Sequence, residues 1–532
     1  MLILHNAKIY TLNEERPTAT ALAIDDHPPH AGRVLAVGDD RTILKEFNQR
    51  VEVQDMGGAV ILPGLTDAHI HLKHYALNLK KVDLVGLSKS EALDQVRDRA
   101  KKTPPGTWIQ GHGWNQNDWP EGFPTAGELD SVAPDHPVYL SHISLHSAWV
   151  NGKALKIAAI DGTTPDPHNG EIQRDKSGGP TGVLLEGAAQ LVTSVLPEPS
   201  LDEVIQVIAT GQEILWKLGL TGIHDFDRIT SFEALQILHE RGDLKLRVLK
   251  GLPLEHLDDA IRVGLRSHFG DDMLHIGGIK LFSDGALGPH TAAMFEPYEG
   301  KPEQKGLPLI DNEELFEIGC KAVQGGFNLA VHAIGDAANH EILIGLARLR
   351  DFEQREGIPH QRHRIEHVQL LHPDDLGALA KIDVIASMQP IHATSDMCMA
   401  DTYWGGRAKY SYAWRSILDE GTRMAFGSDA PVDSPNPFHG IHAAVTRRRG
   451  DGSPGQEGWY PEQRITVAEA IRGYTIGPAY AAGMEDRLGR LAPGYLADLI
   501  VLDVDPFSCP PEELREITPT ATMVGGDWVW KM

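Results

Sequence analysis

The chain has 532 residues, which exceeds one ordinary folding core and predicts two or three folding units. Hydrophobic residues make up 41% of the sequence and there are ten Trp, so a large packed interior is expected and a disordered chain is excluded. The formal net charge of −25, with no basic stripe, argues against nucleic acids and anionic membranes as partners.

Short strands separated by turns are predicted at both ends of the chain. Residues 1–58 alternate short apolar runs with turn signals, and residues 486–532 do the same. Neither end has enough predicted strands to close a sheet by itself. We therefore expect one small β-sandwich that is built from both ends.

Residues 59–485 alternate apolar, strand-like runs with helical stretches, which is typical of a parallel α/β architecture. One predicted helix, at 336–350, follows the fifth of these runs. Repeated strand–helix units predict a (β/α)8 TIM-like barrel. The predicted barrel strands are 59–68, 219–225, 244–251, 274–282, 327–332, 362–367, 382–388 and 423–428.

The spacing of the predicted strands breaks once, between the first and the second. The connection there is far longer than ordinary connections, so residues 80–200 are expected to form an inserted subdomain. The insertion is rich in tryptophans, which suit a subdomain core and a substrate cage equally well. They are Trp108, Trp114, Trp119 and Trp149.

Metal-binding residue types stand at the predicted strand ends. His69 and His71 are two residues apart, so their side chains share one face of the first strand. His332 and His367 end two later strands, and Asp429 follows the last one. Each residue alone could be a packed histidine or a turn-capping aspartate. Catalytic groups of such barrels lie at this end of the strands, so the set together predicts a metal centre.

Lys280, near the end of the fourth predicted strand, is an ordinary lysine paired with Asp284 in one interpretation. In the other interpretation, its amine takes up CO2 and becomes a carbamate, whose oxygens bridge two divalent cations. Such cations prefer negatively charged oxygen ligands. Zn²⁺ fits the ligand types best, and Mn, Fe or Co would also fit. The predicted ligands are His69, His71, Lys280 and Asp429 for the first cation, and Lys280, His332 and His367 for the second.

Several segments resemble the metal-dependent amidohydrolase superfamily. They are Leu-Pro-Gly-Leu-Thr-Asp-Ala-His-Ile-His at 62–71, Arg-Ile-Glu-His at 364–367 and Pro-Gly-Tyr-Leu-Ala-Asp-Leu-Ile-Val-Leu at 493–502. Within the superfamily the chain resembles amidohydrolase family 3, the group that includes N-substituted formamide deformylases. That narrower likeness rests on residues 284–288, 332–338, 388–392 and 474–479. One departure is His290, near which the resemblance leads us to expect an arginine.

The expected activity is hydrolysis of an amide-type carbon–nitrogen bond, as in an N-formyl or N-acyl amine. A hydroxide shared by the two cations would attack, and Asp429 would carry the proton to the leaving nitrogen. His392, at the end of the seventh predicted strand, is a candidate donor to the oxyanion. The alternatives are a one-metal deaminase of an aminated heterocycle, a catalytically inactive scaffold homologue, and a phosphotriester hydrolase on the same metals.

Further residues are candidates for substrate binding. The insertion offers His112, Trp114, His146 and Glu186, and the departure from the family offers His290. Asp336, just after the fifth predicted strand, is better explained as the N-cap of the following helix.

Three features that the sequence does not contain indicate the compartment and the partners of the protein. The three cysteines, Cys320, Cys398 and Cys509, have no metal-binding spacing and suit a reducing cytoplasm. The N-terminus does not have the pattern of a signal peptide. No apolar run approaches the roughly 18 residues of a membrane span. We expect a cytoplasmic enzyme with a small-molecule substrate, and analogy with similar folds suggests a homodimer.

Overall fold

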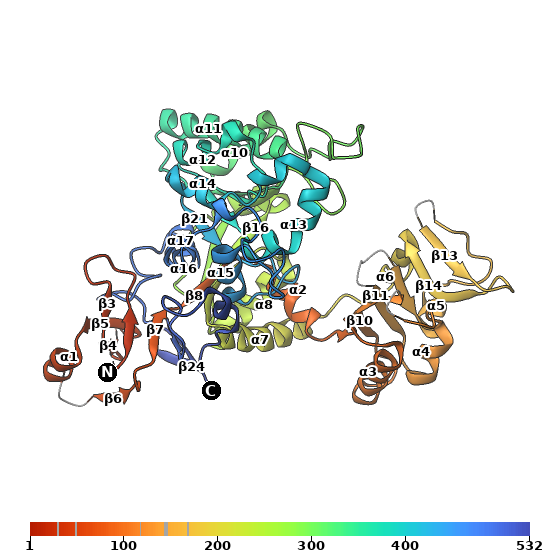
Figure 1. Ribbon diagram of the computed structural model, residues 1–532, viewed down its shortest axis with the longest axis horizontal. Helices are drawn as coiled ribbons and strands as arrows, with labels where there is room; N and C mark the ends of the chain where they lie inside the picture. Colours follow the sequence, from red (N-terminus) through yellow and green to blue (C-terminus); the bar gives the residue numbers. More distant parts are fainter. Residues whose placement is uncertain (29–30, 48–50, 117–118, 143–146, 168–169) are drawn as a thin grey trace. The chain divides into compact units, whose positions relative to one another are not determined.

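The computed structural model describes residues 1–28, 31–47, 51–116, 119–142, 147–167 and 170–532. The chain divides into two compact units, coloured along the sequence in Figure 1. One unit comprises Met1–Tyr75 and Leu201–Met532, and the other comprises Ala76–Ser200.

The larger unit contains the predicted barrel. Within the described residues, an eight-stranded sheet has the order β21-β20-β19-β18-β17-β16-β15-β8, and every strand pair in it is parallel. Backbone hydrogen bonds from Asp429 N to His69 O (2.7 Å) and from His71 N to Ala430 O (2.9 Å) link the end of β21 to β8. The strands are β8 (Leu65–Ile70), β15 (Leu220–Asp225), β16 (Arg247–Pro253), β17 (Leu274–Phe282), β18 (Leu329–Ala333), β19 (Arg364–His367), β20 (Ile385–Met388) and β21 (Met424–Phe426).

These strands are buried along almost their whole length, as expected where helices cover a closed parallel sheet. Figure 1 shows helices such as α10, α11 and α12 on the outside of the barrel. The helices of this unit are α1 (Asp40–Glu46), α2 (Leu72–Asn78), α7 (Leu201–Lys217), α8 (Ile229–Glu240), α9 (Leu257–Arg262), α10 (Asn312–Gln324), α11 (Asp336–Glu356), α12 (Ala378–Lys381), α13 (Pro390–Trp404), α14 (Trp414–Asp419), α15 (Pro437–Thr446), α16 (Val467–Gly473) and α17 (Ile476–Ala481).

The first predicted strand, 59–68, is two strands in the structure. β7 (Val60–Pro63) belongs to a sheet of the chain ends, whereas β8 belongs to the barrel. Gly64 separates them: its N–H donates to Asp498 O at 2.9 Å, and a Cβ there would overlap the side chain of Thr221. The apolar run is continuous because both strands are buried, so the sequence pattern does not show the change of sheet.

The cap of helix α11 also differs from the prediction. Gly335 is the N-cap, and Asp336 is the first residue of the helix. The Asp336 carboxylate instead accepts a hydrogen bond from Phe295 N at 3.0 Å, so it ties the long loop after β17 to this helix.

The chain ends form two sheets. The six-stranded sheet, in the order β24-β23-β22-β7-β2-β3, combines strands from both ends, and the four-stranded sheet has the order β5-β4-β1-β6. A buried, bidentate ion pair between Arg247 of β16 and Asp498 (2.6 and 2.8 Å) links the barrel to the C-terminal strands. The strands are β1 (Leu2–His5), β2 (Lys8–Tyr10), β3 (Thr18–Ala19), β4 (Ala21–Asp25), β5 (Arg33–Gly38), β6 (Glu52–Asp55), β22 (Leu499–Leu502), β23 (Ala521–Val524) and β24 (Asp527–Lys531).

The smaller unit has a mixed six-stranded sheet in the order β13-β14-β12-β11-β10-β9. Its helix α3 begins with a capping box, in which Ser88 and Glu91 satisfy each other's backbone N–H groups. The elements are β9 (Val82–Asp83), α3 (Lys89–Lys102), β10 (Ile109–Trp114), α4 (Ala126–Val132), β11 (Val138–His142), β12 (Ser147–Val150), α5 (Gly152–Ile157), β13 (Gly170–Arg174), β14 (Pro180–Glu186) and α6 (Gln190–Thr193).

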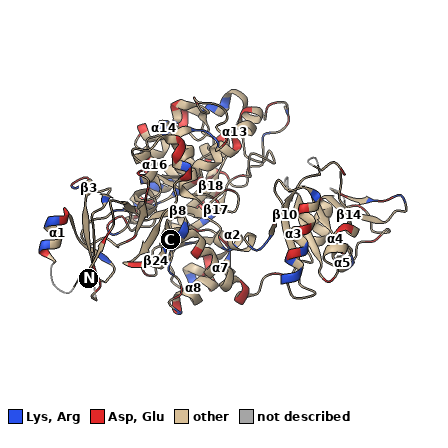
Figure 2. Cartoon of the chain, turned by 60° about the horizontal axis from the view of Figure 1, so that its bottom comes forward, with Lys and Arg blue, Asp and Glu red and all other residues tan. Residues whose placement is uncertain are grey.

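Acidic and basic residues are interspersed along helix α3 (Figure 2), where Asp98 and Lys101 form an ion pair. Among the described residues, no helix is long and apolar enough to cross a membrane.

Candidate metal centre

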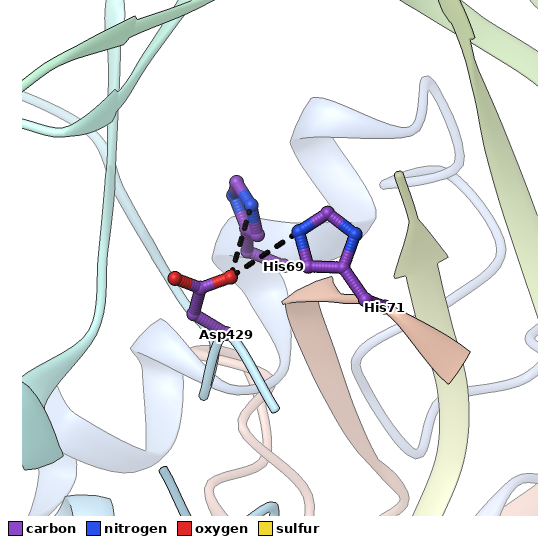
Figure 3. Close-up of side chains that lie close together, drawn as sticks. All are labelled: His69, His71 and Asp429. Carbon is purple, nitrogen blue, oxygen red and sulfur yellow. Dashed lines mark ion pairs between the residues drawn. The ribbon is translucent and has the colours of Figure 1, made fainter. Parts of the chain in front are cut away.

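The C-terminal ends of the first and last barrel strands bring three candidate ligands together. In Figure 3, His69 and His71 both point toward Asp429. Asp429 Oδ1 lies 3.6 Å from His69 Nε2 and 3.4 Å from His71 Nε2. One ligand atom from each residue falls within 4.8 Å of the others, a spacing that could hold a metal ion.

A second group shares Asp429 with the first. His367 and His392 each offer a ring nitrogen within 4.8 Å of the other and of an Asp429 oxygen. The His367 ring centre also lies 5.1 Å from that of His69 and 4.6 Å from that of His332. The structure therefore gathers His69, His71, His367 and His392 around the aspartate, and His332 lies beside His367.

Two residues of the cluster adopt left-handed backbone conformations, which non-glycine residues adopt rarely. The φ angle is 76° at His367 and 57° at Asp429. In a regular strand, neighbouring side chains point to opposite faces, so Glu366 and His367 could not both face the centre. The turn at His367 lets both do so: Glu366 contacts His69, and the His367 ring packs beside it. Such strain is typical of functional sites.

Each of the four histidines has one ring nitrogen facing an oxygen that only accepts hydrogen bonds. The facing nitrogen therefore carries the hydrogen, and on a neutral ring the opposite nitrogen keeps a lone pair that can bind a metal. The pairs are His69 Nδ1 with Glu366 Oε2 at 2.6 Å, His71 Nδ1 with Asp227 Oδ1 at 3.7 Å, His332 Nε2 with Gly285 O at 2.9 Å, and His367 Nδ1 with Gln389 Oε1 at 2.8 Å.

The charge states of three histidines suit metal binding. Burial, aided by the nearby Lys280 charge, lowers the pKa of His69 to about 4 and that of His332 to about 3. Burial likewise holds the pKa of His367 well below its ordinary value. These rings are neutral at pH 7, which is the form that binds metals.

His71 and Asp429 are held differently. Burial alone would lower the pKa of His71, but contacts with Asp227 and Asp429 outweigh it and raise the pKa to about 9. Burial would raise the pKa of Asp429, but its contact with His71 and the nearby His69 keep that pKa well below the ordinary value. A cation in this position would replace the proton between them, since metal binding releases protons from its ligands.

Lys280 lies on β17 with a buried amine that has no hydrogen-bond partner in the described part of the chain. Its Nζ stands 5.0 Å from the ring centres of Phe226 and Phe282. Burial lowers the pKa of Lys280 to about 8, so part of the amine is neutral near pH 7 and can react with CO2. Asp284, the partner of the alternative interpretation, instead accepts hydrogen bonds from the backbone N–H groups of Ala293, Ile334 and Gly335.

Sequence reasoning missed the residues that orient the ligands. Glu366 is fully buried, its Oε1 lies 2.5 Å from Arg364 Nε, and its other oxygen faces His69. Gln389 orients His367 in the same way, and Asp227 Oδ1 lies 3.7 Å from His71 Nδ1. A signal was available for Glu366, because Arg364 and Glu366 are two charged residues on one face of an otherwise apolar strand. Asp227 and Gln389 follow strands β15 and β20 and carried no comparable signal.

The candidate substrate residues lie in several places. His112, Trp114 and Glu186 belong to the smaller unit, and His146 falls outside the described residues. His112 is partly exposed and stands 4.0 Å from Asp83, and Glu186 is exposed at the end of β14. His290, in the loop after β17, packs against the rings of Tyr298 and Tyr403.

Trp114 is fully buried in the core of the smaller unit. Its ring stacks on Trp119 at 5.9 Å and meets Trp149 edge-on, and its Nε1 donates to Leu140 O at 2.9 Å. The indole N–H groups of Trp119 and Trp149 are likewise bound to backbone carbonyls. These contacts favour the subdomain-core interpretation of the tryptophans over a substrate cage.

Comparison with known proteins agrees with this architecture. The sequence profile of the amidohydrolase family matches residues 52–530. The Arabidopsis thaliana protein LONG AFTER FAR-RED 3 is 32% identical over 542 residues, covering 99% of this chain and 91% of that protein. The N-substituted formamide deformylase of Arthrobacter pascens is 29% identical over 548 residues, covering 99% of this chain and 97% of that protein. The crystal structure of an uncharacterized metal-dependent hydrolase from Pyrococcus furiosus superimposes with a TM-score of 0.79 at 29% identity, covering 95% of this chain and 100% of that one.

Proposed function

The chain belongs to the amidohydrolase family and is a metal-dependent hydrolase of carbon–nitrogen bonds other than peptide bonds, and on this premise we propose that it cleaves the amide-type bond of an N-formyl or N-acyl amine. The N-substituted formamide deformylase of Arthrobacter pascens, similar over 99% of this chain, supports that substrate class. The products are a carboxylic acid and an amine.

The observation that carries the proposal is the orientation of the four histidines. An acceptor oxygen faces one nitrogen of each ring, so the other nitrogen is directed away from that oxygen; on His69, His332 and His367, which are neutral, it keeps a lone pair. The amine of Lys280 has no hydrogen-bond partner among the described residues. Nitrogen and carboxylate donors of this kind fit Zn²⁺. The residues that would hold a first cation are His69, His71, Asp429 and a carbamate on Lys280; those for a second are the same carbamate, His332 and His367.

When bound, such cations supply a water that is acidic near neutral pH and polarise the substrate carbonyl. Asp429 takes the proton of the attacking water as the new carbon–oxygen bond forms. It then gives this proton to the nitrogen as the carbon–nitrogen bond breaks. The low pKa of Asp429 keeps its carboxylate ionised at neutral pH. His392, whose ring nitrogen lies within 4.8 Å of an Asp429 oxygen, contacts the carbonyl oxygen of the substrate.

The proposal is tested with metal-reconstituted protein and a panel of N-formyl amines, N-acyl amino acids, cyclic amides, aminated heterocycles and phosphotriesters. We expect amine and acid to form in equal amounts from at least one N-formyl or N-acyl amine. Release of ammonia from the heterocycles alone, with one metal per chain, would identify a deaminase instead. Turnover of the phosphotriesters alone would identify a phosphotriester hydrolase instead.

The proposal also covers the size of the substrate, the compartment and the oligomeric state of the enzyme. Its substrate is a small molecule, and we place the protein in the cytoplasm as a homodimer. All three cysteines are free thiols, which suits a reducing compartment. Size-exclusion chromatography with light scattering measures the oligomeric state directly.

A further inference from the structure

A carboxylate outside the predicted ligand set faces His392. Asp433 follows β21, and its Oδ2 lies 3.6 Å from His392 Nε2. Both side chains are largely buried: 9% of the His392 side chain and 19% of the Asp433 side chain are exposed. The separation is slightly longer than a hydrogen bond, as is common for catalytic contacts before a substrate is bound.

Asp433 is itself held in place from the helix that carries His392. The Ser395 hydroxyl donates to Asp433 Oδ1 at 3.0 Å. Ser395 is three residues after His392 on α13, so both side chains project from the same side of the helix. One oxygen of Asp433 is thereby bound to Ser395, and the other is left facing the imidazole.

Besides Asp433, the His392 ring has His367 and Asp429 as its neighbours at the centre. Among the described residues, its buried Nε2 has no hydrogen-bond partner within the usual distance. Nonetheless the ring is nearly parallel to that of His367, with an interplanar angle of 7° and centres 6.2 Å apart. Because rotation of an imidazole about its last side-chain bond has broad minima, the groups around the ring determine its orientation. Asp433 is the charged group that an ion-pair contact places next to Nε2.

We propose that Asp433 is a positioning residue for His392: Ser395 fixes its carboxylate, and the carboxylate fixes the imidazole with its Nε2 edge toward Asp433 and the opposite edge toward the substrate. This inference rests on the proposed function, because it takes His392 as the residue that contacts the substrate. It adds a residue to the site that none of the predicted roles included.

Helix α13 provides a matched control. Asp396 is one residue after Ser395, and its Oδ2 accepts hydrogen bonds from Tyr412 Oη at 2.6 Å and Gln369 Nε2 at 2.8 Å. It has no recorded contact with His392 among the described residues. Asp396→Asn therefore removes a comparably hydrogen-bonded carboxylate from the same neighbourhood without touching the imidazole.

The test is a double-mutant cycle on metal-reconstituted protein, with kcat, KM and metal content measured for each variant. Asp433→Asn should lower kcat by about tenfold, the lower end of the usual effect of an orienting partner, with metal content and KM nearly unchanged. The same change in a His392→Asn background should cost nothing further, because the group it orients is already absent. Equal losses in both backgrounds, or equal losses in Asp433→Asn and Asp396→Asn, would overturn the proposal.

A second measurement does not depend on turnover. In crystals of the metal-loaded protein, His392 should keep its orientation in Asp396→Asn and should rotate or occupy several orientations in Asp433→Asn. An unchanged ring in Asp433→Asn contradicts the inference even if no substrate has been found. If the wild-type protein hydrolyses none of the amides while the ring behaves as expected, the proposed function fails and the positioning role stands.

Discussion

At the scale of single residues, one buried side chain of the candidate metal centre stands out because it makes no hydrogen bond to the described residues. Lys280 has no hydrogen-bond partner in the described part of the chain, and its burial makes the neutral amine accessible near pH 7. A buried polar group without a partner is costly, so it is retained where a ligand or a modification supplies the partner. A carbamate on Lys280 would replace the amine with a negatively charged group whose oxygens bridge two cations.

Lys280→Ala should therefore lose most activity and the second metal, because the bridge is gone. Native mass spectrometry of the wild-type protein, supplied with Zn²⁺ and bicarbonate, should show an added CO2 and nearly two metals per chain. Short carboxylic acids should restore part of the activity of Lys280→Ala by occupying the vacated position. Lys280→Arg is the control: it fills that position and cannot form the carbamate, so the same acids should not rescue it. Full metal occupancy with unmodified Lys280 would contradict the carbamate.

Loss of a ligand and loss of the proton carrier should have different consequences. His69→Ala should deplete the metal, because it removes one of the lone pairs. Asp429→Asn should keep much of the metal while kcat falls by roughly 10²- to 10⁴-fold, the usual contribution of a general acid–base group. Metal analysis by plasma mass spectrometry, together with kcat on one good substrate, separates the two effects. Near-normal turnover in Asp429→Asn would exclude Asp429 as the proton carrier.

At the scale of elements, the barrel could be predicted because its strands are buried on both faces and read as continuous apolar runs. The run at 274–282 corresponds to β17. The predicted strand ends brought His367 and Asp429 into one cluster, with the ring of His332 beside that of His367. The same property explains why one strand was predicted at 59–68 where the structure has β7 and β8. Two consecutive buried strands of different sheets form one continuous apolar run in the sequence.

The residues that orient the ligands could not be predicted in the same way. His69 meets Glu366 although 297 positions separate them, because barrel closure brings β8 and β19 across the same interior. His367 depends on Gln389, which lies beyond the next strand. Such partners follow from three-dimensional proximity, whereas periodicity reports only which face of its own strand a residue occupies.

The tryptophan core of the smaller unit yields a prediction at this scale. Trp114→Ala removes a fully buried ring and should destabilise the unit by about 3–5 kcal/mol, the usual cost of such a cavity. Hydrogen exchange should show faster exchange in β10 to β14, with metal content unchanged. Trp108, which is only partly buried, provides the control, and Trp108→Ala should cost less. Equal protection in Trp114→Ala and wild type would return Trp114 to the list of substrate-binding candidates.

At the scale of the whole molecule, the chain separates the metal ligands from the long insertion. All predicted ligands belong to the unit formed by Met1–Tyr75 and Leu201–Met532. A hydrolytic site also needs groups that grip the substrate and exclude water. The sequence predicts that residues of the insertion bind the substrate, and the insertion contributes none of the predicted metal ligands.

Substitutions at exposed polar residues of the insertion should therefore alter substrate preference and leave the metals in place. His112→Asn and Glu186→Gln should raise KM or change the ranking of N-acyl amines, because each removes a polar group outside the tryptophan core. Steady-state kinetics on the amide panel and metal analysis measure both quantities. Lys153→Ala, an exposed position of the same unit, should leave the ranking as it is. If all three variants have wild-type preferences, the determinants lie in the loops at the barrel strand ends.

The change of sheet at Gly64 also bears on how the protein is made. β7, joined through Gly64 to the strand that carries His69, pairs with β22 at Leu499–Leu502. The ribosome therefore synthesises the anchor of the first ligand strand more than 400 residues before its partner. Contacts of such sequence separation form late, because a long loop must close first. β7 can pair with β2, which is synthesised before it, and β8 can pair with β15 well before the chain ends. The sheet that joins both ends of the chain, however, can close only after Leu499–Leu502 has been synthesised.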